Sequence, residues 1–236
     1  MELAFNHVSV DCVVFGFDGE HLKILLIRRT GFDEGETFQD MKLPGSIIYL
    51  DEDLDEAANR VLFELTGLKN VQMAQFRAFG SAHRTDNPRD VFWLRHTVRQ
   101  EISRIVTVAY IAAMPIDAVT YSMSEGTDSV WVDIDEIPGL RLAFDHNQII
   151  SAAFRHIKEV VDVNDSAVFN ILPEKFTINQ YRTLLEIIKG HKLDYANLYK
   201  KLPKMPYVVP LEEKQTGGQH RSARYYKYVP ENRNED

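Results

Sequence analysis

Cysteine is almost absent from this chain of 236 residues, and apolar runs of membrane-spanning length are missing. Cys12 has no second cysteine to pair with, so an internal disulfide is excluded, and its apolar surroundings favour a small buried core residue over a nucleophile. A membrane helix needs about 20 apolar residues. The opening stretch MELAFNHVSVD lacks the basic start and long apolar core of a secretory signal. We therefore expect a cytoplasmic protein without a membrane partner.

Positive charge is scarce in the first 170 residues and gathers towards the end of the chain. Residues 171–236 carry 12 Lys and Arg against 8 Asp and Glu, a net charge of +4, so the total of −8 leaves −12 for residues 1–170. An acidic large part joined to a mildly basic small one is typical of a regulatory body with a nucleic-acid-binding end. Solvated surface charge is the alternative explanation.

The stretch from residue 43 to residue 68 reads LPGSIIYLDEDLDEAANRVLFELTGL and organises the rest of the chain. Acidic residues before and at the start of the expected helix suit the partial positive charge of a helix N-terminus. An apolar stripe then follows at helical spacing, and Gly67 stands where a C-cap glycine is expected. The stripe consists of Ala57, Val61, Leu62 and Leu65.

These residues resemble the Nudix box, G-x5-E-x7-R-E-U-x-E-E-x-G-U, in which U is a bulky aliphatic residue. A generic amphipathic helix is the alternative, but the flanks, spacing and register agree together. The resemblance implies a fold of the α/β class, a Nudix α/β/α sandwich over residues 7–160. The residues that match the box are Leu43, Pro44, Gly45, Glu52, Arg60, Glu64, Gly67 and Leu68.

Three box positions differ from the family pattern. Ser46 replaces the box glycine, and Val61 and Leu65 replace two of the three helix carboxylates, so that Glu64 alone remains. In the family these carboxylates hold Mg²⁺ or Mn²⁺ against a diphosphate, and hard cations need several oxygen ligands. We therefore expect a Nudix fold that has lost its hydrolytic metal site, with no catalytic residue, no metal and no cofactor. Glu52, Arg60 and Glu64 are residual box residues.

Apolar and β-branched runs predict the remaining strands of this part. They are expected at His7–Phe17, His21–Ile27, Val71–Phe79, Ser103–Met114 and Val130–Ile134, with a turn at Asp18-Gly19. Gly31–Met41 is polar and is expected to be a loop. Asp145 is expected to be the N-cap of a helix that runs through Lys158, with His146 as a structural residue in its first turn. The stretch 90–102 matches no helix or strand pattern, and we expect it to line either the ligand pocket or a dimer interface.

Four arginines are candidates for binding an anionic ligand beside the box helix. Arg28 and Arg29 leave the second strand together, and Arg84 and Arg89 lie in the charged stretch after the Val71–Phe79 strand. All four are expected to face phosphate groups of a ligand. For Arg28 and Arg29, a solvated strand edge is the equal alternative.

The last 64 residues carry a separate helical pattern. Thr177 and Gln180 form a capping-box pair, an apolar stripe follows, and Gly190 ends the first helix. Asp194 then starts a second helix that stops before Pro203, and two short helices joined by a tight turn are typical of a helix-turn-helix. We expect a ligand-sensing domain at residues 1–160, a linker with apolar anchors at 161–172 and a DNA-binding domain at 173–236.

Two further strands, Tyr207–Leu211 and Arg224–Val229, flank a polar, glycine-rich tip and predict a hairpin wing. Together with the two helices they resemble the winged helix of Nudix-related transcriptional regulators of the NrtR type, whose phrases are F-T-L-x-Q-L-x-x-L-Y-E-x-I-x-G, N-F-R-R-K and G-x-x-R-P-A-x-L-Y-x-F. Tyr199 and Lys200 stand here for the two arginines of the second phrase, so the operator sequence is expected to differ. The matches are Phe176, Thr177, Gln180, Leu184, Glu186, Ile188, Gly190, Asn197–Lys201 and Gly218–Tyr226.

The second helix and the wing supply the candidate DNA contacts. Amide, phenol and ammonium groups on a short helix suit base edges and phosphates of a major groove, and cations at a wing suit phosphates or a minor groove. A small accessory domain with a solvated basic face is the alternative. The candidate residues are Tyr195, Asn197, Tyr199, Lys200, Lys201, Lys204, His220, Arg221 and Arg224.

The favoured hypothesis is a ligand-responsive transcriptional regulator that binds double-stranded operator DNA as a homodimer. The resemblance implies a small-molecule effector, either a nucleotide such as ADP-ribose or a sugar or sugar derivative. The alternative is an active Nudix pyrophosphohydrolase of nucleoside diphosphate derivatives with an accessory winged domain. In that alternative, Glu56 would complete a metal site with Glu52 and Glu64.

Overall fold

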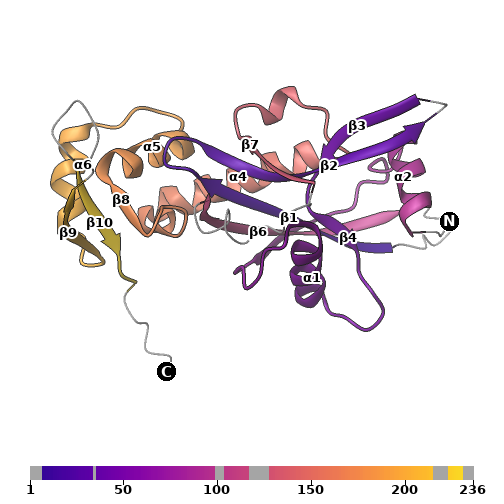
Figure 1. The fold of residues 1–236 in the computed structure, drawn as a ribbon, viewed down its shortest axis with the longest axis horizontal. Coiled ribbons are helices and arrows are strands. Elements are labelled where there is room, and N and C mark those ends of the chain that lie inside the picture. The colour runs from indigo at the N-terminus through magenta and orange to yellow at the C-terminus, as the bar shows by residue number, and fades with distance from the viewer. Residues whose placement is uncertain (1–6, 34–35, 99–103, 117–127, 215–222, 231–236) are drawn as a thin grey trace.

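The computed structural model describes residues 7–33, 36–98, 104–116, 128–214 and 223–230. A mixed sheet forms the larger part, and a small winged-helix unit lies beyond one end of that sheet (Figure 1). Among the described residues, the structure contains no helix that is both long and apolar enough to cross a membrane.

The larger sheet has the strand order β3-β2-β1-β6-β5, with β4 paired to β1 and β7 paired to β2. β1 runs antiparallel to β2 and parallel to β6, with Val10 opposite Val108. The parallel pair at the centre is buried, as parallel strands usually are. The strands are β1 (His7–Phe17), β2 (Leu22–Asp33), β3 (Glu36–Lys42), β4 (Gly45–Ile47), β5 (Ala74–Phe79), β6 (Ile105–Pro115) and β7 (Ser129–Asp133).

Helices cover both faces of this sheet because side chains along β1 alternate between the two. Cys12 and Val14 pack with the α1 residues Ala58 and Val61, whereas Phe15 belongs to the cluster on the α4 side. This is the expected α/β/α sandwich, and the fold class is confirmed. The helices are α1 (Leu54–Thr66), α2 (Pro88–Val98), η1 (Ile137–Gly139), α4 (His146–Val163) and η2 (Asp165–Asn170).

The box helix begins and ends as its sequence predicts. The Asp53 side chain accepts hydrogen bonds from the first-turn amides of Asp55 and Glu56, and the Glu56 side chain in turn accepts one from the Asp53 amide. Gly67 closes the helix at φ 79°, a left-handed conformation that glycine adopts without strain. The buried face of α1 includes Ala57, Val61 and Leu62.

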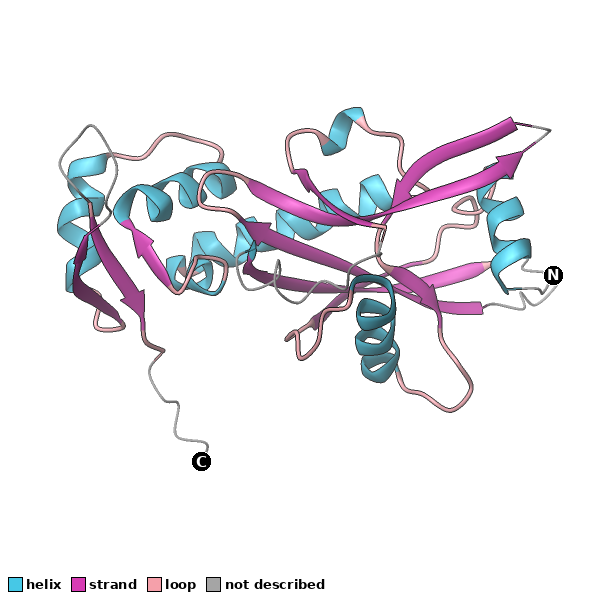
Figure 2. Cartoon of the chain, in the orientation of Figure 1, coloured by secondary structure: helices cyan, strands magenta, loops and turns pink. Residues whose placement is uncertain are grey.

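The winged-helix unit combines a three-stranded sheet of order β8-β10-β9 with two helices (Figure 2). Thr177 and Gln180 form the expected capping box, Gly190 ends α5 at φ 75°, and Asp194 caps α6. The elements are β8 (Lys175–Thr177), α5 (Ile178–Lys189), α6 (Tyr195–Lys201), η3 (Leu202–Lys204), β9 (Val208–Lys214) and β10 (Arg224–Tyr228).

The expectation of a loop at Gly31–Met41 is wrong. β2 continues past Arg28 and Arg29 to Asp33, and β3 pairs with it in register, with Arg29 opposite Asp40. The Arg29 guanidinium binds both Asp40 and Asp90, so a charged pair occupies the position where an apolar residue would have signalled a strand. The polar composition of this stretch therefore led to the prediction of a loop where the chain forms the antiparallel pair β2–β3.

Two further expectations need correction. The stretch 90–102, which fitted no element, lies largely in helix α2, although residues 99–102 are outside the described part. Asp145 is the N-cap residue of α4, as expected, but its side chain makes no cap hydrogen bond, because its carboxylate accepts hydrogen bonds from Arg84 instead. A tertiary ion pair has replaced a local cap.

The segment between the two parts is packed rather than extended. Residues 161–172 form the last turn of α4 and the helix η2, and Val168 and Phe169 are buried. Phe169 stacks on Tyr181 of α5 at 5.3 Å and on Tyr228 at 4.9 Å between ring centroids. One apolar cluster therefore runs from β1 and α4 into the winged helix.

Candidate functional site

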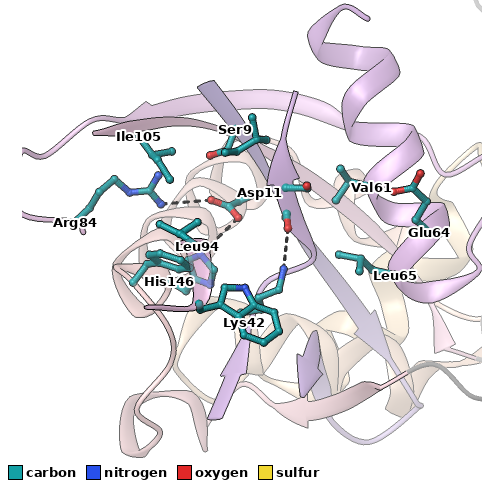
Figure 3. Close-up of a pocket in the computed structure, with 15 residues that line it drawn as sticks. Ser9, Asp11, Lys42, Val61, Glu64, Leu65, Arg84, Leu94, Ile105 and His146 are labelled. Carbon is teal, nitrogen blue, oxygen red and sulfur yellow. Dashed lines mark hydrogen bonds and ion pairs between the residues drawn. The ribbon is translucent and has the colours of Figure 1, made fainter. Parts of the chain in front are cut away.

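A cavity of about 190 Å³ lies beside the box helix, between β1, α1, α2 and the start of α4 (Figure 3). Its walls combine apolar and aromatic groups with a few charged ones, as is usual for a small-molecule site. The lining residues are Ser9, Asp11, Lys42, Gly45, Ser46, Ile47, Val61, Glu64, Leu65, Arg84, Trp93, Leu94, Ile105, Phe144 and His146.

Strand pairing fixes the floor of the cavity. Asp11 on β1 lies opposite Gly45 on β4, and a Cβ atom at Gly45 would overlap the Asp11 carboxylate and lie 2.9 Å from the Val10 carbonyl oxygen. The glycine of the box lead-in is therefore needed here for space. The buried Lys42 ammonium donates to the Gly45 carbonyl at 2.7 Å and holds the same turn from the other side.

Buried charges at the cavity floor are paired with one another. Arg84 Nη2 lies 2.8 Å from Asp145 Oδ1 and 3.5 Å from Asp11 Oδ2. His146 Nε2 lies 3.5 Å from Asp11 Oδ1, and His146 Nδ1 accepts a hydrogen bond of 2.9 Å from the Leu43 amide. Because Nδ1 accepts, the proton belongs on Nε2, which faces Asp11.

Burial sets the protonation of these groups. It lowers the pKa of His146 to about 4, so the imidazole is neutral at pH 7. Burial also lowers the pKa of Lys42 to about 8. For Asp11, burial raises the pKa, but the neighbouring His146 and Arg84 outweigh this effect, and the pKa lies below its ordinary value. The floor is thus a balanced set of acidic and basic groups.

The two remaining box carboxylates, Glu52 and Glu64, accept hydrogen bonds from the box arginine, Arg60. Arg60 Nε donates to Glu52 Oε2 at 2.7 Å, and Arg60 Nη1 donates to Glu64 Oε2 at 3.1 Å. Val61 and Leu65 present alkyl groups to the cavity where carboxylates would stand in the family box. Glu56, the alternative third ligand, is engaged in the α1 capping box.

These donors do not fit a hydrolytic Mg²⁺ site. A hard cation needs several convergent oxygens, and here Glu64 is the box-helix carboxylate that borders the cavity. Within the described residues, no group of three or more His, Cys, Asp and Glu side chains is arranged to hold a metal ion. The arrangement suits ligand binding by shape and hydrogen bonding.

The four candidate arginines occupy different places. Arg84 lines the cavity. Arg29 is buried behind the wall, where Asp40 and Asp90 bind it, so the geometry gives it a supporting position rather than a ligand-facing one. Arg28 is exposed on β2, and the half-buried Arg89 lies with its guanidinium 5.3 Å from the centre of the Phe38 ring. A ligand role for Arg84, Arg28 and Arg89 stays a prediction.

Several cavity residues were not anticipated from the sequence. Asp11 could have been found, because a lone carboxylate inside an apolar strand must have buried partners. Lys42 stands next to the box lead-in without any distinguishing pattern. Trp93 and Phe144 reach the cavity only because α2 folds against β2 and the loop before α4; the Phe144 amide donates to Asp90 at 2.9 Å.

The candidate DNA-binding residues of α6 form an exposed surface. Leu198 faces the core, while Tyr195, Asn197, Tyr199 and Lys200 are exposed. The two tyrosine rings lie 6.1 Å apart, and the Arg182 guanidinium of α5 lies 5.3 Å from the Tyr195 ring. This combination offers hydrogen-bond donors, aromatic edges and positive charge on the exposed surface of α6.

The remaining candidates differ in their surroundings. Lys204 follows in η3 and Arg224 begins β10, and both are exposed. Lys201 instead donates to Asp165 at 2.8 Å. His220 and Arg221 lie outside the described residues. Contact of any of these with DNA stays a prediction.

Comparisons with known proteins agree with this architecture. The NUDIX domain family matches residues 5–153, and the NrtR DNA-binding winged helix domain matches residues 168–228. The ADPR responsive transcriptional repressor NtrR of Acinetobacter baylyi is 27% identical over 224 residues, which cover 94% of this chain and 82% of that protein.

Solved structures share the fold over most of the chain. Shewanella oneidensis NrtR in complex with a 27mer DNA gives a TM-score of 0.70 at 24% identity, covering 94% of this chain and 93% of that one. A MutT/nudix family protein from Enterococcus faecalis gives a TM-score of 0.63 at 20% identity, covering 96% and 89%. The NUDIX match spans more than half of the sequence, and the chain therefore belongs to the NUDIX domain family, with an NrtR-type DNA-binding winged helix after it.

Proposed function

We propose that this chain is a transcriptional regulator that binds double-stranded operator DNA and senses a small molecule in its Nudix cavity without hydrolysing it. One observation carries the proposal: an NrtR-type winged helix follows a Nudix domain whose box helix turns Val61 and Leu65 into the cavity. Alkyl groups at these positions keep a pocket of the right shape and remove the oxygen ligands that hydrolysis would use.

In this proposal α6 enters the major groove. Asn197 and the tyrosines contact base edges, and Lys200 and Lys204 contact phosphates. A palindromic operator needs two such helices related by two-fold symmetry, so the protein acts as a homodimer. Binding to chromosomal DNA places it in the cytoplasm.

Two effector classes have support. The Acinetobacter baylyi relative is ADPR responsive, which favours ADP-ribose. The pairing inside the cavity favours a neutral sugar, because Arg84 and Lys42 already have oxygen partners and an anionic diphosphate would have to displace Asp145 from Arg84. A polyhydroxyl ligand can hydrogen-bond to the paired groups and pack against Trp93 without that exchange.

DNA binding is tested by mobility shift with a duplex from the region upstream of the protein's own gene. We expect a discrete complex that weakens steeply with salt, and a weaker one with Asn197→Ala plus Lys200→Ala. Ala196→Ser is a matched control because it changes an exposed α6 position without removing a donor or a charge. Absence of any complex at low salt would contradict the proposal.

Hydrolysis is tested separately. The protein is incubated with ADP-ribose and other nucleoside diphosphate conjugates in Mg²⁺ and in Mn²⁺, and products are separated by chromatography. We expect no turnover above the buffer rate. Turnover that disappears in Glu64→Gln would instead identify a Nudix pyrophosphohydrolase with an accessory winged domain.

A further inference from the structure

One of the candidate DNA-binding lysines has a carboxylate partner inside the protein. Lys201 Nζ, at the last position of α6, lies 2.8 Å from Asp165 Oδ2. Lys200, the preceding residue on the same helix, has no carboxylate within ion-pair distance in the described part of the chain. The two neighbouring lysines therefore differ in how readily they can reach a phosphate.

Asp165 is held in place from a second side. Its other oxygen, Oδ1, lies 3.1 Å from Lys189 Nζ at the end of α5, and Lys189 also lies 3.3 Å from Asp162. The Asp165 side chain is 26% exposed and the Lys201 side chain 59% exposed. The carboxylate is thus the better fixed partner, and the lysine is the one that moves.

The position of Asp165 is tied to the Nudix domain. It opens η2, whose first turn is capped by Asn164, immediately after the end of α4. α4 is 18 residues long and begins at His146 in the cavity wall, so it spans about 27 Å between the cavity and Asp165. Buried Val168 and Phe169 anchor the same segment in the shared core. Asp165 is therefore presented to α6 by the packed segment that joins α4 to the winged helix.

We propose that Asp165 competes with DNA phosphate for Lys201 and so sets the DNA affinity from within the protein. While the ion pair is closed, Lys201 is neutralised and contributes little to phosphate binding. When the ion pair opens and Lys201 turns towards the DNA, it adds one phosphate contact for each bound chain. This inference rests on the proposed function, because it needs α6 to meet DNA.

The test is a salt series with the full-length protein and a fluorescent duplex from its own upstream region. Each phosphate neutralised steepens the plot of log K against log salt by about 0.9. We expect Asp165→Asn to steepen the slope by about that amount per bound chain. At low salt it should bind the duplex roughly two- to five-fold more tightly, the effect of freeing an exposed ion pair.

Matched variants separate competition from a general change of surface charge. Asp162→Asn removes the same charge nearby but is bonded to Lys189 and not to Lys201, so the slope should stay at the wild-type value. Lys201→Gln should lower the slope more in the Asp165→Asn background than in the wild type. Far-UV circular dichroism establishes that each variant is folded.

The outcomes are distinguishable. If the wild type forms no complex at low salt, the proposed function fails and this inference falls with it. If the wild type binds, but Asp165→Asn has the same slope and affinity, the competition is refuted while the proposed function stands. Equal effects of Asp162→Asn and Asp165→Asn, or of Lys201→Gln in both backgrounds, would also overturn the inference.

Discussion

At the scale of single residues, the cavity floor depends on a position without a side chain, Gly45, next to a buried carboxylate, Asp11. Gly45 leaves room for the Asp11 carboxylate, whose two oxygens each lie 3.5 Å from a basic group, one from Arg84 Nη2 and the other from His146 Nε2. Burying such groups is costly unless each is paired, and removal of one partner is more damaging than the net value of the pair. The floor therefore tolerates little change.

Gly45→Ala tests this steric requirement. The added methyl would overlap the Asp11 carboxylate and approach the Val10 backbone, and neither can shift without breaking the β1–β4 pairing. We expect a loss of roughly 2 kcal/mol or more in the free energy of unfolding by urea. Gly139→Ala is the control, since a Cβ there meets no atom within 4 Å. Equal stability of the two variants would contradict the geometry.

His146 gives the molecule a pH-dependent stability. Its pKa is about 4 in the folded protein and near 6.5 when unfolded, so the unfolded state binds the proton first as the pH falls. This contribution is complete above pH 6.5 and is lost progressively down to pH 4. Between pH 7 and pH 5, we expect wild-type unfolding free energy to fall by about 2 kcal/mol more than that of His146→Asn. Parallel curves for the two proteins would refute this assignment.

At the scale of elements, local chemistry was readable from the sequence and tertiary chemistry was not. The caps at Thr177, Gly67 and Gly190 were predictable because each is decided within a few residues. The β2–β3 hairpin was missed because its polar residues are satisfied across the sheet. Asp145 takes the expected N-cap position, but the absence of its side-chain cap hydrogen bond could not be predicted, because its partner, Arg84, is 61 residues away.

The same limit applied to the candidate site. The box register located Glu64, Val61 and Leu65 at the cavity without any structure. Arg29 looked as available as Arg84, since nothing near it in sequence indicates that Asp90 binds it from 61 positions away. Only the packing of α2 against β2 separates the two arginines.

Asp53→Ala tests the start of the box helix. The variant loses the hydrogen bonds from the Asp55 and Glu56 amides, and such caps contribute about 1 kcal/mol. We expect a decrease of that size in urea unfolding, and less than about 0.5 kcal/mol for Asp51→Ala, an exposed carboxylate in the preceding turn. If the two variants lose the same stability, the cap has no special role.

At the scale of the whole molecule, the two family domains share one apolar cluster. Phe169 contacts Tyr181, Tyr207 and Tyr228 of the winged helix, and the same cluster continues to Phe15 of the Nudix sheet. A packed junction of this kind transmits a movement of α4 to α6 more directly than a flexible linker would.

Phe169→Ala tests this continuity. Both tryptophans, Trp93 and Trp131, lie in the Nudix domain, so their fluorescence reports unfolding there, while circular dichroism reports all helices. We expect coincident transitions in the wild type, and a loss of about 3–5 kcal/mol by both probes in the variant. Val163→Ala, at a side chain that is 90% exposed, should change little. A shift in circular dichroism alone would show two independent domains.

The central claim is that occupation of the Nudix cavity changes DNA affinity. The most direct measurement is the anisotropy of a labelled upstream duplex bound to the full-length protein, titrated with ADP-ribose and, separately, with neutral sugars. We expect one ligand class to change the DNA dissociation constant at least about five-fold, with the ligand recovered intact. We expect Trp93→Ala in the cavity wall to lose that response, and Phe63→Ala on the outer face of α1 to keep it. DNA binding that is unaffected by every ligand, or a response that survives in Trp93→Ala, would contradict the claim.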